Sequence, residues 1–257
     1  MKAKNIKLCR KVVAFAMATS FTVVGTAAQA SGDEVKYSPA LVHGHYYDED
    51  VKQYKKDLAL GIEVKEVEFN MKLEALSKVF DGLPVKIHAH QADDIATAIR
   101  IAKEFGLKMT VDHATEGYLI ADFLKENNQA VILGPTLGNK SKYELKAKSF
   151  ASGKVLNEAG VDFAIMTDHP VIEQKHTLVQ VALFVKAGLD ELSALKAVTI
   201  NAAKLCGIDK MVGSIKVGKD ADIVIYKGNP LDIFSSVYAT IIDETNRQQN
   251  KIELIAS

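Results

Sequence analysis

The chain has 257 residues, of which 48% are hydrophobic, and it carries 32 basic and 32 acidic residues. This length and hydrophobic content are enough to bury a substantial core, which excludes an intrinsically disordered protein. The balanced charge leaves no basic patch of the kind that binds DNA or RNA. We therefore expect a folded protein with no nucleic-acid partner.

The first thirty residues have the layout of a secretory signal peptide. "MKAKNIKLCRK" carries five positive charges and no acid, "VVAFAMATSFTVVGTAA" is uncharged and apolar, and "AQA" ends on small residues. We predict cleavage after Ala30 and an exported, periplasmic or secreted protein; an uncleaved membrane anchor is the alternative. Later apolar runs are too short to cross a bilayer, so no membrane span is expected. Cleavage would leave Cys206 as the one cysteine and no intramolecular disulfide.

Residues 31–83 are polar and weakly patterned, and we predict a solvated, largely helical connection. Within this segment, "ALVHGHYYDED" places His43 and His45 one residue apart after a short apolar run. Such a pair could end a strand and bind a metal. The charged residues that follow favour the helical interpretation.

From Pro84 onward, short apolar runs alternate with amphipathic stretches. The first amphipathic stretch, "DDIATAIRIAKEFG", repeats apolar residues every three or four positions, starts with two aspartates and ends at a glycine, which predicts a helix. A long helix is also expected over residues 141–160. The expected strands are "PVKIH", "LKMTVDH", "QAVILGP" and "VDFAIMTDHP". Strands that alternate with helices predict the α/β class with a parallel sheet.

Potential metal ligands stand at the ends of three of these strands. They are His88, His90, Asp112, His113, Asp168 and His169. Because the carboxyl ends of parallel strands lie at one edge of the sheet, these side chains should converge. Imidazoles with one carboxylate are a ligand set that zinc favours in hydrolytic sites. The sequence therefore predicts a divalent metal, with zinc as the expected ion.

Several segments resemble the metal-dependent amidohydrolases, particularly the imidazolonepropionase-like group. The segments are "IHAH", "DHATEGY", "GPTL", "MTDHP" and "AVTINAAKLCGIDKMVGSIKVGKDADIVIYKGNPLD". The resemblance runs from about Met71 to about Asp243. Its last part is similar to the family's terminal helix and the hairpin that begins a small β domain, which implies a short β unit around residues 212–226.

The resemblance also implies roles for individual residues. His88 and His113 correspond to metal ligands at the ends of barrel strands five and six. Asp168 corresponds to the aspartate after strand eight, which contacts the metal and acts as the catalytic general base. The residues alone leave His88 and His90 as alternatives. The resemblance favours His88, which stands where the family's ligand stands relative to the preceding apolar run, and it leaves His90 as a neighbour that contacts the substrate or hydrogen-bonds to a ligand. A helix cap is the alternative role for Asp168.

Only four of the eight strand–helix units of a full barrel are legible in this sequence. The stretch before Pro84 is too short for four more units. We therefore expect an α/β fold that resembles the C-terminal half of the family: a partial TIM-type (β/α) barrel of about strands five to eight over residues 84–210. A small β unit and a tail are expected over residues 211–257.

The function implied by the resemblance is metal-dependent hydrolysis of a carbon–nitrogen bond in a small-molecule substrate, such as a non-peptide amide, a cyclic amide or a dipeptide. The alternative is a truncated, non-catalytic remnant with an incomplete metal site. A homo-oligomer or a separately encoded N-terminal half could complete the barrel. A doubly wound nucleotide-binding fold is disfavoured because no Gly-rich loop follows the first strand.

Overall fold

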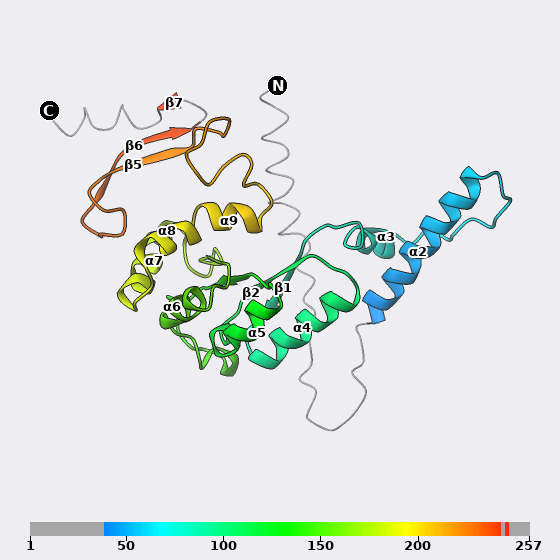
Figure 1. Ribbon diagram of the computed structural model, residues 1–257, viewed down its shortest axis with the longest axis horizontal. Coiled ribbons are helices and arrows are strands. Elements are labelled where there is room, and N and C mark those ends of the chain that lie inside the picture. The colour runs from blue at the N-terminus through cyan, green and yellow to red at the C-terminus, as the bar shows by residue number, and fades with distance from the viewer. Residues whose placement is uncertain (1–38, 243–244, 247–257) are drawn as a thin grey trace.

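The computed structural model describes residues 39–242 and 245–246 (Figure 1). The predicted signal peptide, residues 1–30, lies outside the described residues. The α-helices are α2 (Pro39–Ala59), α3 (Met71–Ser77), α4 (Ala92–Glu104), α5 (Ala121–Glu126), α6 (Ala151–Glu158), α7 (Thr177–Lys186), α8 (Glu191–Ala197) and α9 (Ile200–Leu205). Short 3-10 helices are η1 (Gly117–Ile120), η2 (Tyr143–Leu145) and η3 (Gln174–His176). The strands are β1 (Val85–Ala89), β2 (Met109–His113), β3 (Val131–Leu133), β4 (Phe163–Ile165), β5 (Ile223–Lys227), β6 (Ser236–Ile242) and β7 (Thr245–Asn246).

Strands β1 to β4 form a parallel sheet in the order β1-β2-β3-β4. β1 pairs with β2 from Val85 opposite Met109 to Ala89 opposite His113. The α/β class is confirmed, and so is the expectation that residues 84–88 and 107–112 lie in adjacent parallel strands. All four carboxyl ends lie at the same edge of the sheet, since the strands run in one direction.

One face of this sheet packs against helices. Its strand residues in the buried core are Ala89, Val111, Val131, Leu133, Phe163 and Ile165. Ile95 and Ile99 of α4 and Val181 and Phe184 of α7 belong to the same core. Figure 1 shows α4 and α5 in front of β1 and β2. Burial of these apolar side chains is the main force that holds the helices to the sheet.

The opposite face of the sheet is polar along β1 and β2. Lys86 and His88 lie in register with Thr110 and Asp112, and strand residues two apart share a face. Thr110 and Asp112 are buried. The Lys86 ammonium is buried as well, and it has no hydrogen-bond partner among the described residues. The charge of Lys86 acts on the neighbouring Asp112, whose pKa it lowers against the larger effect of burial, but a buried ammonium without a hydrogen bond still costs free energy.

The long helix expected over residues 141–160 was wrong in its first half. η2 covers three residues of that range, and the helix proper, α6, begins at Ala151. The N-cap residue of α6, Phe150, makes no side-chain cap bond, but the Ser149 hydroxyl before it accepts a hydrogen bond from the Ala151 N–H, one of the free N–H groups at the helix start. Upstream, the Lys148 ammonium donates to the Gly138 and Asn139 carbonyls, which holds the segment as a loop.

The segment before β1 contains α2 and α3, in agreement with the helical interpretation. His43 and His45 lie inside α2 and not at the end of a strand. The His45 ring packs against Phe80 and Phe105, with ring centroids 5.3 and 5.6 Å apart. The His-x-His alternative for this pair is therefore wrong. The domain boundary at residue 84 stays a prediction.

The C-terminal β unit is a small antiparallel sheet in the order β5-β6-β7. Its first strand starts at Ile223, so the expected unit at 212–226 was placed too early. Gly213 and Gly218 adopt left-handed φ angles of 89° and 88°, and the Lys219 ammonium donates to the Val212 carbonyl and to the Ser214 hydroxyl. These features make residues 212–219 a turn. In the described part of the chain, no helix is both long and apolar enough to span a membrane.

Candidate metal centre

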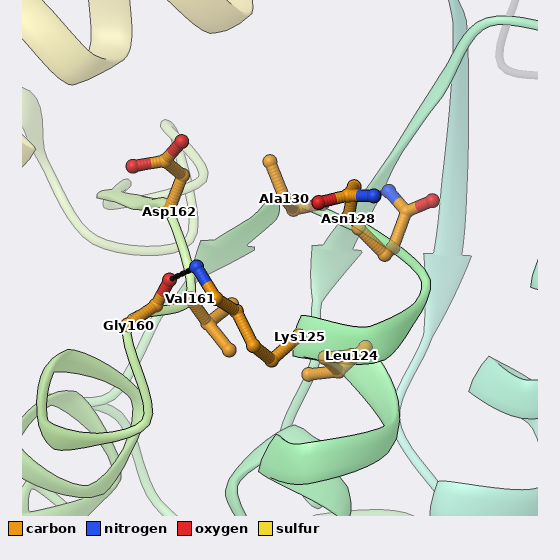
Figure 2. A pocket seen from close by; sticks show the side chains of 8 residues that line it. Leu124, Lys125, Asn128, Ala130, Gly160, Val161 and Asp162 are labelled. Atoms are coloured by element: carbon orange, nitrogen blue, oxygen red, sulfur yellow. Dashed lines mark hydrogen bonds between the residues drawn. The ribbon is translucent and has the colours of Figure 1, made fainter.

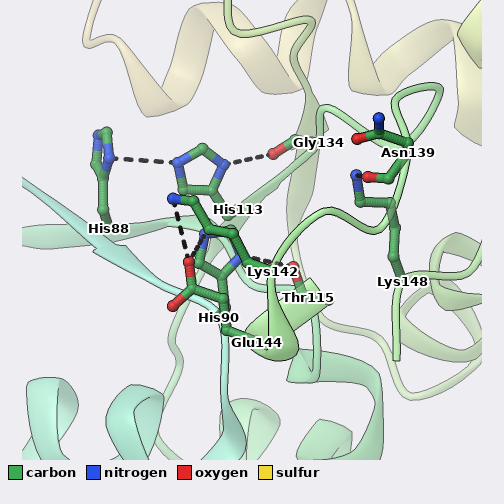
Figure 3. Close-up of polar contacts among 9 residues, drawn as sticks. All are labelled: His88, His90, His113, Thr115, Gly134, Asn139, Lys142, Glu144 and Lys148. Carbon is green, nitrogen blue, oxygen red and sulfur yellow. Dashed lines mark hydrogen bonds and ion pairs between the residues drawn. The ribbon is translucent and has the colours of Figure 1, made fainter. Parts of the chain in front are cut away.

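The predicted site residues gather at the carboxyl edge of the four-stranded sheet. His88 lies near the end of β1, His113 ends β2, Gly134 follows β3 and Asp168 follows β4. Figure 3 shows the rings of His88, His90 and His113 at this edge. The parallel topology therefore brings together the histidines that the sequence separates.

One ring nitrogen of His88 faces one ring nitrogen of His113. The Nε2 atom of His113 lies 3.2 Å from the Nδ1 atom of His88, and the rings are nearly perpendicular with centroids 4.7 Å apart. On its other side, His113 Nδ1 lies 2.7 Å from the Gly134 carbonyl oxygen. A carbonyl can only accept, so Nδ1 carries the proton and the neutral ring presents its lone pair at Nε2.

The pair fits two positions of a tetrahedral zinc. Two nitrogens bound to one such ion at about 2.0–2.1 Å lie about 3.3 Å apart, close to the observed separation. Burial lowers the pKa of His113, which favours the neutral ring that a metal requires, while the Gly134 carbonyl and the charge of Asp168 act in the opposite direction. Within the described residues, however, no three His, Cys, Asp or Glu side chains are close enough to form a complete metal site.

His90 belongs to a separate hydrogen-bonded group. Its ring stacks on His113 with centroids 4.5 Å apart, and its Nδ1 atom lies 2.7 Å from the Thr115 hydroxyl. Its Nε2 atom lies 3.7 Å from the Glu144 carboxylate. Burial, followed by the neighbouring charge of His113, lowers the pKa of His90 to about 4. The geometry thus pairs His113 with His88 and leaves His90 stacked beside the pair, bonded to Thr115.

Asp168 stands at the edge of this cluster. Its backbone adopts φ 53°, in the left-handed region, and its side chain is half-buried. Its charge raises the pKa of His113, which places the carboxylate within electrostatic reach of that ring. Asp168 caps no helix in the described chain, because the next helical turn, η3, begins at Gln174. The catalytic role stays a prediction.

The chain matches the amidohydrolase family over residues 5–255. It is a member of that family. The imidazolonepropionase of Maricaulis maris (strain MCS10) is 33% identical over 150 residues, which are 56% of this chain and 36% of that protein. Amidohydrolase tasK of Hapsidospora irregularis is 25% identical over 192 residues, which are 72% of this chain and 19% of that protein. The resemblance to amidohydrolases found in the sequence is confirmed.

A solved amidohydrolase has the same fold over most of the chain. The crystal structure of an amidohydrolase from Thermotoga maritima MSB8 superposes with a TM-score of 0.71 at 39% identity, covering 80% of this chain and 55% of that chain. This chain therefore spans about half of that structure and a smaller share of the curated relatives. The amidohydrolase family is typically metal-dependent, in keeping with the two facing histidines.

Two residues contact the candidate site in ways that the sequence did not predict. Asp112 Oδ2 lies 3.9 Å from Nε2 of His88, and burial raises the pKa of Asp112. Gln180 of α7 is fully buried and bonds to the loops after β3 and β4. A signal for Gln180 was present, because it is the one uncharged polar residue inside the apolar run "LVQVALFV".

A pocket of about 60 Å³ lies at the opposite end of the same strands (Figure 2). Its lining includes Ala130 just before β3 and Asp162 just before β4. The Lys125 ammonium crosses it to reach the Gly160 carbonyl at 2.8 Å. In folds with parallel strands and helices, the chemistry lies at the carboxyl ends, so we assign no part of the site to this pocket.

Proposed function

We propose that this amidohydrolase family member hydrolyses carbon–nitrogen bonds in small amides with the help of a bound zinc ion. The observation that carries this proposal is the facing pair of His88 and His113, whose nitrogens are spaced for a shared metal. We further propose that β1 to β4 correspond to strands five to eight of a TIM-type barrel.

In the proposed reaction, each residue has a separate task. His113 offers Nε2 because its Nδ1–H is held by the Gly134 carbonyl. By the same assignment His88 Nδ1 donates to His113 Nε2, so His88 would offer Nδ1 to a metal after its proton moves to its own Nε2. A zinc ion held there would supply an acidic water and a polarised substrate carbonyl. Asp168 takes the proton of the attacking water as general base and then delivers it to the leaving nitrogen. A cyclic amide, a linear non-peptide amide or a dipeptide fits this scheme.

Metal content of the purified full chain tests the proposal. We expect close to one zinc per chain in the wild type and loss of that zinc in His88→Ala and in His113→Ala. His176→Ala is the matched control, because His176 is an exposed histidine in η3 to which the proposal gives no role. If wild type and both site variants hold equal amounts of zinc, the assignment of these ligands fails.

A second candidate is a family member without catalytic activity. It is favoured by the lack of a third metal ligand close to the histidine pair among the described residues. Turnover of a panel of dipeptides and cyclic amides, measured with added zinc, distinguishes the two candidates. Turnover that disappears in Asp168→Asn supports the hydrolase, whereas bound zinc without turnover supports the second candidate.

We also propose export with cleavage after Ala30, on the signal-peptide pattern of the first thirty residues. The mass of the N-terminal peptide in a periplasmic or secreted fraction tests this proposal. A mature N-terminus at Ser31 is expected, and an exported chain that still begins at Met1 contradicts it.

A further inference from the structure

Gln180 is a buried glutamine that bonds only to backbone groups in the part of the chain described. Its side chain is 0% exposed in α7, among apolar neighbours such as Val181 and Phe184. Its Oε1 atom accepts hydrogen bonds from the N–H groups of Thr136 at 2.9 Å and Leu137 at 3.2 Å. Its Nε2 atom donates to the Met166 carbonyl at 2.8 Å. One side-chain amide therefore joins two loops.

Both loops belong to the proposed metal centre. Thr136 and Leu137 closely follow Gly134, whose carbonyl accepts the Nδ1–H of His113. Met166 precedes Asp168 by two residues, and its own N–H donates to the Leu133 carbonyl at 2.8 Å. A shift of either loop would therefore move the acceptor of His113 or the carboxylate of Asp168.

We infer that Gln180 is a positioning residue for this centre, which fixes the Gly134 carbonyl and the Asp168 loop relative to each other. The inference rests on the proposed function. The Gly134 carbonyl keeps the proton of His113 on Nδ1, which leaves the lone pair of the ring at Nε2. Gln180 does not touch the ring; it acts by fixing the backbone that carries this carbonyl. Groups that bond directly to a metal-ligating histidine change metal affinity or activity by about 10–100-fold when removed, and the Gly134 carbonyl that Gln180 fixes is such a group.

The chemistry of the contacts explains why the residue is a glutamine. Thr136 and Leu137 need an acceptor, whereas Met166 needs a donor, and an amide offers both from one rigid group. A glutamate at position 180 could still accept from the first loop but, when ionised, could not donate to the Met166 carbonyl. A leucine could satisfy neither loop and would leave buried backbone groups unpaired.

The test compares Gln180→Leu and Gln180→Glu with Gln129→Leu as a matched control. Gln129 also bonds through its side-chain amide to backbone carbonyls, those of Met109 and Ala130, but at the amino ends of β2 and β3. Zinc affinity of each full-length chain is measured by titration calorimetry. The tautomer of His113 is measured separately by ¹⁵N NMR of the imidazole nitrogens in the metal-free chain.

We expect the Gln180 variants to bind zinc about 10–100-fold more weakly than wild type and to lose the single Nδ1–H tautomer of His113. Gln129→Leu should lower thermal stability while leaving zinc affinity and tautomer unchanged. Unchanged affinity and tautomer in a folded Gln180 variant would overturn the inference. If Gln180→Leu does not fold, Gln180→Glu gives the same readouts.

The tautomer readout separates this inference from the proposed function. A wild-type chain that binds no zinc contradicts the proposed function, yet the Nδ1–H signal of His113 still reports whether Gln180 positions the loop. Loss of that signal in both the Gln180 and the Gln129 variants would show a general structural effect and would overturn the positioning role.

Discussion

His113 and Asp168 share an unusual backbone conformation. Both lie in the left-handed region, with φ angles of 73° and 53°. Residues with a Cβ occupy this region at a cost of about 1–2 kcal/mol each, and such positions concentrate at functional sites. The turn at the end of β2 directs the His113 ring toward His88, whereas Val111, two residues earlier, packs into the core. At His113 this conformation accompanies the orientation of the imidazole toward His88.

This strain predicts a difference between two variants of His113. His113→Ala and His113→Gly should both abolish zinc binding, because neither offers an imidazole. The glycine variant should be more stable than the alanine variant by about 1 kcal/mol, because glycine adopts positive φ without steric cost. Chemical denaturation of the metal-free variants measures the difference. A glycine variant that is clearly less stable than the alanine variant would show that the φ angle carries no strain.

Asp168→Asn replaces one carboxylate oxygen with an NH₂ group and so tests whether Asp168 is the general base. An amide cannot accept the proton of the attacking water, so turnover of whichever panel amide the wild type hydrolyses should fall by about 10²–10⁴-fold. Thermal stability should change little, since the Asp168 side chain makes no hydrogen bond or ion pair in the described part of the chain. Turnover close to that of the wild type would rule out Asp168 as the base.

The sequence predicts some contacts of the site residues and not others. The proximity of His88 and His113 could be predicted, because adjacent parallel strands bring their carboxyl ends together. The bonds of Gln180 could not, because its partners are the backbone groups of Thr136, Leu137 and Met166, and backbone groups leave no pattern in the sequence. For the same reason, the sequence does not predict that the Gly134 carbonyl accepts the Nδ1–H of His113.

At the scale of helices and strands, prediction worked where the hydrophobic pattern is strong. Residues 84–113 were predicted well, because α4 buries residues at helical spacing and a short apolar run marks the strand on either side of it. Residues 141–150 were mispredicted because helical periodicity contains no information about the Lys148 ammonium and its two carbonyl acceptors. Tertiary hydrogen bonds decided the structure of that segment.

The contact between α6 and α7 leads to a prediction for Gly153. A Cβ at this position would lie 2.8 Å from Cδ1 of Phe184 and 3.2 Å from a methyl of Leu189. Phe184 is fully buried and cannot easily yield. We expect Gly153→Ala to lower the free energy of unfolding by about 1–3 kcal/mol, in spite of the better helix propensity of alanine.

A double-mutant cycle with Phe184→Leu checks the cause of that loss. Urea unfolding of the two single variants and the double variant gives the coupling between the positions. The cost of Gly153→Ala should be smaller when residue 184 is leucine. An equal cost in both backgrounds would place the cause outside this contact.

At the scale of the whole molecule, the parallel sheet has two different edges. On β4, the Asn201 side chain of α9 donates to the Phe163 carbonyl at 3.1 Å and covers part of that edge. On β1, the Val85 N–H donates inward to the Lys108 carbonyl, so the N–H groups of Lys86 and His88 point outward, because N–H directions alternate along a strand. Among the described residues no strand pairs with this edge of β1, and unpaired strand edges favour association with another strand.

The β1 edge predicts concentration-dependent self-association of the full chain. Lys86→Pro should weaken this association, because proline removes one outward N–H group while the inward bonds of β1 remain. Lys86→Ala is the control, since it keeps the N–H and removes only the side chain. Sedimentation velocity over a range of concentrations measures the effect. A wild-type chain that stays monomeric throughout, or equal association of both variants, contradicts the role of this edge.

Gly134 has a consequence for the evolution of this site. A Cβ there would lie 2.0 Å from the Met166 carbonyl oxygen, and the φ angle of 126° already excludes most side chains. The obstacle is backbone and not a neighbouring side chain, so no second substitution can make room. We therefore expect position 134 to accept only glycine as long as the two loops keep this arrangement, so the carbonyl that accepts the His113 Nδ1–H depends on that glycine.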